Sequence, residues 1–191
     1  MNKLFFSVVF VITVGVTNVQ AAENCVSGES VSVKGDIDNN IVNVRNPNGL
    51  GLYTMGVARL GLKSERKSIK LHCALLGEPT GEQNPTVGHQ YDHMIVCDDG
   101  QQSEIAFKTR FVAQDSTLTN VLTNEEIEDF CHTPYAVVAF KELAEVNGER
   151  LTKGVFQGAS GQLIVAGCVN ALGSGMEVNM SVKGDLCLPN W

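Results

Sequence analysis

The fold class follows from the stretch Met176-Glu177-Val178-Asn179-Met180-Ser181-Val182-Lys183-Gly184-Asp185-Leu186, in which apolar and polar residues alternate. Successive side chains of a β-strand point to opposite faces, so this alternation predicts a strand with one buried face. The stretch 103–111 repeats the pattern, with Ile105, Phe107 and Phe111 on one face and Glu104, Lys108 and Arg110 on the other.

Working outward, the same periodicity predicts further strands, which we place at residues 31–34, 41–45, 52–62, 68–76, 91–97, 135–146, 150–156 and 161–169. Asp99-Gly100 and Asn147-Gly148 predict tight hairpins, because Asx-Gly pairs tolerate the positive φ angles of a type I′ turn. Gly173-Ser174-Gly175 predicts a looser one. One short helix is expected at about 124–131, where Thr123 and Glu126 fit a capping box.

Many strands in hairpin order with one short helix are typical of an antiparallel barrel or sandwich. The two ends of the chain favour the barrel. Antiparallel pairing of Val31 with Val182 and of Val33 with Met180 would join their apolar faces, and closing the first strand on the last leaves no exposed edge. We therefore expect an all-β fold, a closed antiparallel β-barrel of about eight strands.

Six cysteines allow three disulfides with no thiol left over. Cys25–Cys187 follows from pairing the first strand with the last. Cys73–Cys97 follows if strands 68–76 and 91–97 are antiparallel neighbours, and Cys131–Cys168 is then the remaining pair. His72 beside Cys73 and His132 beside Cys131 could form a thiol–imidazole pair, but such a nucleophile needs a free thiol, so we favour disulfides.

The first 21 residues predict a cleaved signal peptide. Lys3 precedes an apolar run from Leu4 to Val16, which is too short to span a bilayer. The segment ends in Val19-Gln20-Ala21, a small-residue cleavage site. Residues 22–191 are then one exported domain, periplasmic or secreted and bacterial in the style of its signal, in a compartment where disulfides form. Cys25 lacks a lipidation motif, so no lipid anchor is expected.

The net charge is −7, and −8 without Lys3, the one charged residue of the first 21. An acidic chain argues against non-specific binding to nucleic acid or to anionic membranes. No second apolar segment reaches spanning length, so we expect no membrane insertion.

The string Gly154-Val155-Phe156-Gln157-Gly158-Ala159-Ser160-Gly161-Gln162-Leu163 resembles the G-x-F-x-G-x-x-G-x-[LV] pattern of the allene oxide cyclase-like barrels. That superfamily includes plant allene oxide cyclases, dirigent-like proteins and secreted bacterial proteins. The resemblance covers about residues 135–187 and implies an eight-stranded antiparallel barrel with a mostly apolar interior. It carries over no active site, because no cyclase catalytic residue matches a position here and the six cysteines depart from the plant enzymes. Independently, the glycines suit bulges and tight bends at a barrel corner.

Two stretches are candidates for metal ligands, and we expect neither to bind one. His89 and His93 are spaced as zinc ligands on a helix, but on a strand they would lie about 13 Å apart, so we interpret 89–93 as a hydrated loop. Asp36-x-Asp38-Asn39-Asn40 begins like a calcium loop, yet Ile41 and Pro47 stand where Gly and Glu are needed. We interpret that stretch as a turn between two strands. No cofactor is expected.

Glu142 is the candidate for catalysis, because it lies midway along the apolar face of Ala136, Val138, Phe140 and Ala144. Inside a barrel its pKa would be raised, and it could act as an acid or base. The alternative, which we favour on the sequence, is that a twist or bulge carries it to solvent.

Three functions remain open. The first is an exported, non-enzymatic barrel that binds an apolar small molecule or a protein partner, with candidate ligand contacts Phe107, Phe111, Val138, Phe140 and Met180. The second is an isomerase or cyclase acting on an apolar substrate in the barrel cavity. The third is a structural or surface-interaction module with a packed interior. Eight-stranded barrels enclose just enough space for side chains or one small ligand, so the interior decides among them.

Overall fold

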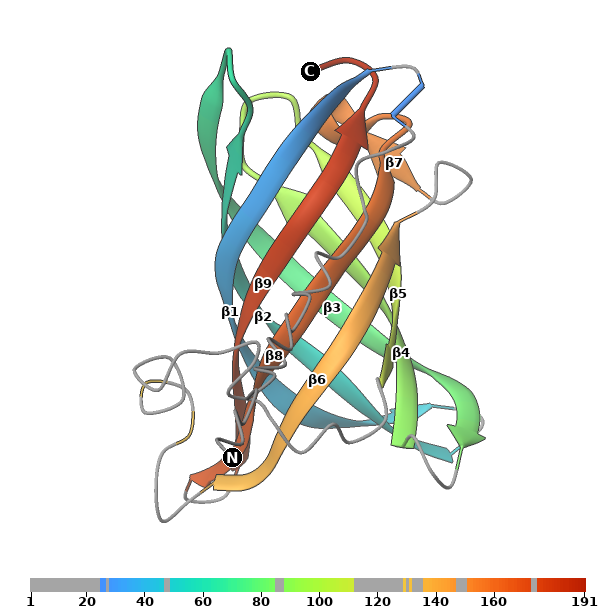
Figure 1. Ribbon diagram of the computed structural model, residues 1–191. Helices are drawn as coiled ribbons and strands as arrows, with labels where there is room; N and C mark the ends of the chain where they lie inside the picture. The colour runs from blue at the N-terminus through green and yellow to red at the C-terminus, as the bar shows by residue number, and fades with distance from the viewer. Residues whose placement is uncertain are drawn as a thin grey trace, which may run out of the picture.

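The computed structural model describes residues 25–26, 28–46, 49–84, 88–111, 129, 131, 136–146, 151–172 and 175–191. They form a barrel of long, tilted strands (Figure 1). The strands are β1 (Glu29–Asn46), β2 (Gly49–Lys63), β3 (Ser68–Asn84), β4 (Gly88–Cys97), β5 (Glu104–Phe111), β6 (Ala136–Val146), β7 (Thr152–Lys153), β8 (Ser160–Leu172) and β9 (Gly175–Leu188), with a 3₁₀ turn η2 (Gly154–Phe156) after β7.

The strands close on themselves in the order β1-β2-β3-β4-β5-β6-β8-β9, every pair antiparallel, while the two-residue β7 adds to β5. The predicted all-β closed barrel of eight strands is therefore confirmed. Following the paired residues once around the wall from Ile69 leads to Pro79 on the same strand, an advance of ten residues. A shear of ten in eight strands inclines each strand by about 40° to the barrel axis.

The first strand differs from the prediction in length and register. Residues 36–40 do not form a turn: β1 runs unbroken through them from Glu29 to Asn46. The first and last strands are antiparallel neighbours as predicted, but Val33 pairs with Gly184 rather than with Met180. This slip of four residues leaves the inward face unchanged, because side chains alternate with a period of two.

All three predicted disulfides are present: Cys25–Cys187, Cys73–Cys97 and Cys131–Cys168. The predicted hairpin joins β4 to β5, but its loop is longer than the expected two-residue type I′ turn: the Cys97 amide donates to the Ser103 carbonyl, and Gly100 has a positive φ of 76° while Asp99 does not. The signal peptide, the turn residues 147–148 and 173–174, and nearly all of the helix at 124–131 fall outside the described residues. Strands β8 and β9 pair up to Leu172 and Gly175, on either side of the predicted looser hairpin turn.

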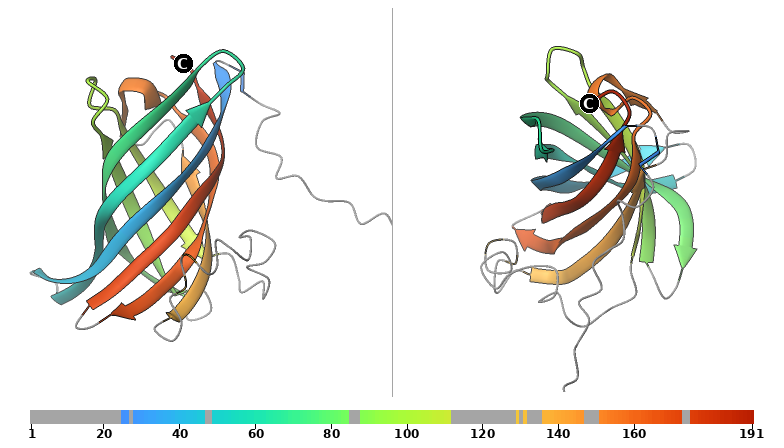
Figure 2. Two further views of the ribbon diagram at one scale, coloured as in Figure 1. Left: turned by 90° about the vertical axis from the view of Figure 1, so that its left-hand side faces the viewer. Right: turned by 45° about the horizontal axis from the view of Figure 1, so that its top comes forward.

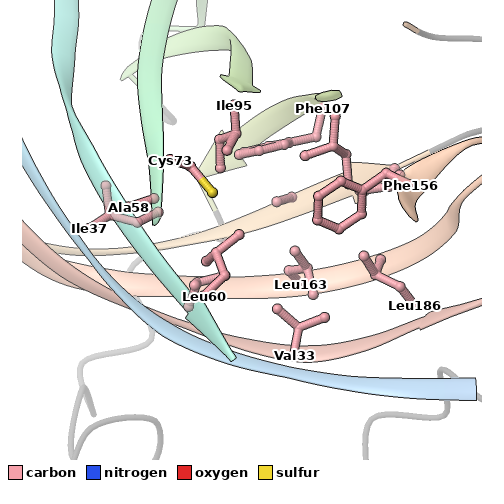
Figure 3. Close-up of a cluster of buried hydrophobic side chains, with 14 of the residues drawn as sticks. Val33, Ile37, Ala58, Leu60, Cys73, Ile95, Phe107, Phe156, Leu163 and Leu186 are labelled. Carbon is pink, nitrogen blue, oxygen red and sulfur yellow. The ribbon is translucent and has the colours of Figure 1, made fainter. Parts of the chain in front are cut away.

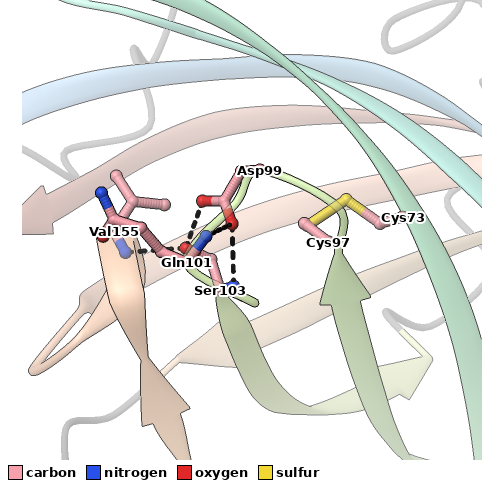
Figure 4. Close-up of a disulfide and its surroundings, with 6 residues drawn as sticks. All are labelled: Cys73, Cys97, Asp99, Gln101, Ser103 and Val155. Carbon is pink, nitrogen blue, oxygen red and sulfur yellow. Dashed lines mark hydrogen bonds between the residues drawn. A yellow bond between two sulfur atoms is a disulfide. The ribbon is translucent and has the colours of Figure 1, made fainter.

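The 3₁₀ turn η2 follows β7, which lies at the upper end of the barrel in Figure 1. The predicted strand 150–156 is only two residues long, because Gly154 adopts a φ of 61° and turns the chain inward. Phe156 then projects into the barrel and is buried. The Ser103 hydroxyl accepts a hydrogen bond from the Val155 amide and donates one to Asp99, beside the Cys73–Cys97 bridge (Figure 4). The glycine-rich string therefore closes one end of the barrel.

Inward-facing residues of all eight barrel strands build one core. Around the upper interior they are apolar and converge on Phe156, as Figure 3 shows. The labelled members of this layer are Val33, Ile37, Ala58, Leu60, Cys73, Ile95, Phe107, Leu163 and Leu186. Two views of the barrel at other angles show the strands wrapping continuously around this core (Figure 2).

Candidate functional site

The apolar layer of the barrel interior is filled. The cavity that the structure describes there has a volume of about 10 Å³ and is lined by ten apolar residues, Phe107 and Phe156 among them. That is room for one water molecule at most. Phe107, a predicted ligand contact, therefore lies in the packed part of the barrel, where its ring stacks on His93 at 5.3 Å.

Below this layer, five inward-facing polar side chains follow one another around the barrel wall. We call them the polar belt: Asn39 on β1, Thr54 on β2, His93 on β4, Thr109 on β5 and Glu142 on β6. Each is buried, and none is more than 8% exposed. Buried polar groups are costly unless they find hydrogen-bond partners, so the partners of the belt decide what it can do.

Thr109 is the centre of one half of the belt. Its hydroxyl hydrogen-bonds the Glu142 carboxyl and lies 3.4 Å from His93 Nδ1 and 3.5 Å from the Tyr91 carbonyl. Burial raises the pKa of Glu142 to about 7, although the hydrogen bond from Thr109 opposes the rise. Burial lowers the pKa of His93 to about 4, against a smaller upward effect of Asp92. Between about pH 4 and pH 7 both side chains are therefore uncharged.

Through Thr109, the protonation state of Glu142 can influence which tautomer His93 adopts. A hydroxyl has one proton to donate. When Glu142 is protonated, its O–H donates to Thr109, whose own O–H can then donate either to Nδ1 of neutral His93 or to the Tyr91 carbonyl. When Glu142 is ionised, Thr109 donates to the carboxylate instead and can accept only from an Nδ1–H. Loss of the Glu142 proton thus favours the other tautomer of His93.

The other half of the belt has polar atoms without partners. Both amide atoms of Asn39 and the hydroxyl of Thr54 are buried and have no hydrogen-bond partner among the described residues. Glycines make room beside them: a Cβ on Gly56 would collide with the Asn39 amide, and one on Gly77 would collide with both Thr54 Oγ1 and the His93 ring. Thr54 and His93 therefore meet over Gly77, which joins the two halves of the belt.

The structure corrects three interpretations made from the sequence. Glu142 does not reach solvent on a twist or bulge, because β6 pairs regularly with β8 there and Glu142 points inward opposite Val165. Residues 89–93 are not a hydrated loop: they belong to β4, and the His93 side chain is buried in the interior. Asn39 is not a turn residue, because β1 carries it into the core.

The remaining predicted ligand contacts are placed as follows. Phe140 and Met180 are buried on the inner face, where each pairs with Gly167 from a neighbouring strand. The backbones of Phe111 and Val138 lie at inward positions of β5 and β6, and their side chains fall outside the description. Phe140 and Met180 thus flank Gly167, and Met180 also pairs with Ile37 of β1, two residues from Asn39.

The cysteines have a structural role. Every cysteine is in a disulfide, and His72 points out of the barrel while Cys73 points in. No group of three or more histidine, cysteine, aspartate or glutamate side chains converges among the described residues. The two stretches weighed as metal ligands, 36–40 and 89–93, are parts of strands β1 and β4.

A second hollow of about 510 Å³ lies on the upper rim between the start of β1 and the end of the chain. Its wall includes Trp191, which donates a hydrogen bond from Nε1 to Ser64 Oγ at 2.9 Å. Lys67 lies over the ring of this tryptophan, 4.5 Å from its centroid. These contacts fasten the C-terminus to the turn between β2 and β3, so the rim has a structural role.

Comparisons with protein-family models, with curated proteins and with solved structures find no match to this chain. The resemblance to allene oxide cyclase-like barrels therefore stays a prediction. In the part of the chain that the structure describes, no helix has the length and apolar character required to cross a bilayer.

Proposed function

We propose that this is an exported binding barrel that holds a small, mainly apolar ligand in its lower interior and hydrogen-bonds the polar end of that ligand through the polar belt. The observation that carries the proposal is the unpartnered half of the belt. Three buried polar atoms of Asn39 and Thr54 have no hydrogen-bond partner in the described part of the chain, and each such atom costs roughly 1–3 kcal/mol if nothing binds it. Sites for small molecules combine apolar walls with a few placed polar groups.

The chemistry of the belt specifies the class of ligand. Asn39 offers both a donor and an acceptor, Thr54 offers a hydroxyl, and the Glu142 carboxyl is neutral below about pH 7. A neutral amide, alcohol or undissociated acid satisfies such groups, whereas an isolated charge would be buried without a counter-ion. The packed upper layer, with its void of about 10 Å³, limits the apolar part of the ligand to the lower barrel.

Asn39→Leu tests the proposal. Leucine shares the branching of asparagine at Cγ but needs no hydrogen bonds, so we expect the variant to be more stable than the wild type by about 1–3 kcal/mol and to lose ligand binding. Stability is measured by urea unfolding. Binding is measured by calorimetry with a ten-carbon series of matched probes, namely the alkane, the alcohol and the primary amide. The wild type should prefer the amide and the alcohol over the alkane.

The matched control is Asn40→Leu, one residue along β1 and exposed on the outer wall. It should change stability by no more than about 0.5 kcal/mol and leave probe binding unaltered. The proposal fails if the wild type binds no probe, or if Asn39→Leu binds the amide as tightly as the wild type does.

A second function, an isomerase or cyclase, is favoured by one observation. The Glu142–Thr109–His93 chain places an acid with a pKa of about 7 beside a hydroxyl and an imidazole, and general acids and bases work best near the operating pH. In an enzyme, Glu142→Gln would keep ligand affinity and abolish turnover. In a binding protein the bound molecule is recovered chemically unchanged from wild type and variant alike.

We also infer export to the periplasm or the medium, and membership of the allene oxide cyclase-like superfamily. Three disulfides are consistent with an oxidising compartment. The eight-stranded closure and the positive φ angles at Gly154, Gly158 and Gly161 suit the glycine pattern of that superfamily.

Export predicts a mature chain that begins at Ala22. Intact-mass analysis of protein from the native host should give residues 22–191 less six hydrogen atoms for the three disulfides. A mass that includes residues 1–21, or a lipid on Cys25, would contradict it.

A further inference from the structure

The outer wall of the barrel carries one continuous exposed apolar surface. Five large hydrophobic side chains are exposed among the described residues, and four of them, Met55, Val57, Leu76 and Leu151, gather on the wall of β2 to β5. We call this surface the apolar band and define it by Met55, Val57, Leu76, Met94, Val96 and Leu151. The fifth exposed residue, Val26, precedes β1 and lies apart from the band.

The strand register makes the band continuous. Met55 pairs with Leu76, Leu76 with Met94, and Met94 with Ala106, whose amide donates to the Leu151 carbonyl at 2.9 Å. A second row, Val57 with Ala74 and Ala74 with Val96, lies directly above the first. The wall that carries these rows includes the cyan and green strands facing the viewer in the left view of Figure 2. A contiguous exposed apolar surface of this kind marks an interaction site.

Charges at the two ends of the band have opposite sign. Along the outer face of β3 the order is Lys70, His72, Ala74, Leu76 and Glu78, so a basic end and an acidic end flank the apolar centre. Lys70 and Glu78 are both exposed, and Glu78 accepts a hydrogen bond from the Tyr53 hydroxyl at 3.3 Å. The pattern is thus positive, apolar and negative along a single strand.

This pattern is complementary to itself. A two-fold axis that lies in the plane of the interface, perpendicular to β3 and through the centre of the band, sets β3 of one copy antiparallel to and facing β3 of the other. Lys70 and His72 of each copy then face Glu78 of its partner, and the apolar centres face each other. Closed two-fold dimers need just such a self-complementary surface.

We propose that the apolar band is the interface of a homodimer, with the two β3 strands antiparallel and Lys70 of each copy next to Glu78 of the other. The band lies on the outside of the barrel and Asn39 and Thr54 lie on the inside, so dimerisation is independent of the proposed ligand. Dimerisation also buries an apolar surface that would otherwise promote non-specific association.

The apolar part is tested with the mature chain, residues 22–191, by sedimentation equilibrium. The wild type should dimerise at micromolar concentrations. Leu76→Glu places two carboxylates in the apolar centre and should weaken the dimer roughly a hundredfold. Val26→Glu is the matched control on the exposed hydrophobic outside the band and should leave the dimerisation constant unaltered. Urea unfolding of each variant shows that the fold is retained.

The orientation is tested by charge reversal. Glu78→Lys alone and Lys70→Glu alone each place like charges together twice per dimer, so each should weaken self-association by roughly two- to thirtyfold. An equimolar mixture of the two variants restores both contacts, because one copy has lysine at both positions and the other has glutamate at both. Native mass spectrometry should show the mixed dimer in excess of either homodimer.

A wild type that stays monomeric up to about 200 µM overturns the proposal, and so does equal weakening by Val26→Glu. A mixture of charge variants that forms no excess of mixed dimer overturns the antiparallel arrangement. Binding of monomeric protein to phosphatidylcholine vesicles, lost in Leu76→Glu, would instead assign the band to a lipid surface.

Discussion

Replacing both cysteines of the Cys25–Cys187 bridge by alanine should lower the free energy of unfolding by about 5 kcal/mol. The bridge closes a sequence separation of 162 residues, the longest of the three, and the loop-entropy model gives about that figure for such a span. Typical domains are stable by 5–15 kcal/mol in total, so the variant should be close to unfolded at 37 °C. Urea unfolding at 25 °C measures the loss.

The same experiment separates the two ways in which a disulfide can stabilise. If the bridge acts on the denatured chain, its removal lets that chain expand, and the dependence of stability on urea should steepen. Cys131→Ala/Cys168→Ala is the matched comparison, with a separation of 37 residues and an expected loss of about 4 kcal/mol. A loss below about 2 kcal/mol for Cys25–Cys187, with an unaltered urea dependence, would contradict the entropic account.

The sequence predicted this bridge without the correct register, and the reason is physical. Alternation shows which residues face inward, so it excludes a slip by one residue, but a slip by two or four leaves every face unchanged. Val33 therefore pairs with Gly184 while the prediction placed Met180 there. The pairing of the two strands and the nearness of their cysteines do not depend on that slip, and both were predicted correctly.

The polar belt was only partly predictable. Glu142 interrupts an apolar face, so the sequence singled it out, but alternation alone could not decide between the interior and a local twist. Asn39 was missed because four Asp and Asn residues between 36 and 40 are typical of a turn. One signal in the sequence could have identified it. Val33, Ile37, Asn39 and Ile41 all stand at odd positions, so they would share one face of a single strand that continues through the supposed turn. Thr54 and Thr109 are ordinary strand residues, and only the barrel closure brings them together.

The closed end of the barrel shows a second limit. Residues 150–156 have a strand-like composition, yet the chain leaves the sheet after Lys153 because Gly154 adopts a positive φ. The placement of Phe156 inside the barrel depends on a hydrogen bond from the Val155 amide to the Ser103 hydroxyl, 52 residues away in the chain. A long-range hydrogen bond of this kind has no local pattern in the sequence.

Between about pH 4.5 and pH 6.5 the titrations of His93 and Glu142 should have opposite effects on the free energy of unfolding of the wild type. The two effects should nearly cancel. The pKa of His93 falls from 6.5 to about 4 on folding. The unfolded chain therefore binds the extra proton between these values, and stability rises with pH there. The pKa of Glu142 rises from 4.5 to about 7, so the folded chain binds the extra proton and stability falls with pH. Each effect amounts to about 3 kcal/mol.

Replacing either side chain should reveal how the other one alone makes the free energy of unfolding depend on pH. In Glu142→Gln only His93 titrates, and relative to the wild type the free energy of unfolding should rise by about 3 kcal/mol between pH 4.5 and pH 7. In His93→Asn, whose amide keeps a polar group near Thr109, it should fall relative to the wild type by about 3 kcal/mol between pH 4 and pH 6.5. Tyr91 titrates above this window, since burial and then Glu142 raise its pKa.

Urea unfolding at half-unit pH steps, with the double variant as control, checks both slopes. In the double variant both titrations are gone, and its pH profile should run parallel to that of the wild type. Exposed carboxylates contribute equally to all four proteins, so the differences between profiles isolate the belt. Parallel profiles for all four proteins would show that Glu142 and His93 keep ordinary pKa values. They would then have to be solvated in the folded state, and the interior could not be the dry, neutral polar site on which the proposed ligand class depends.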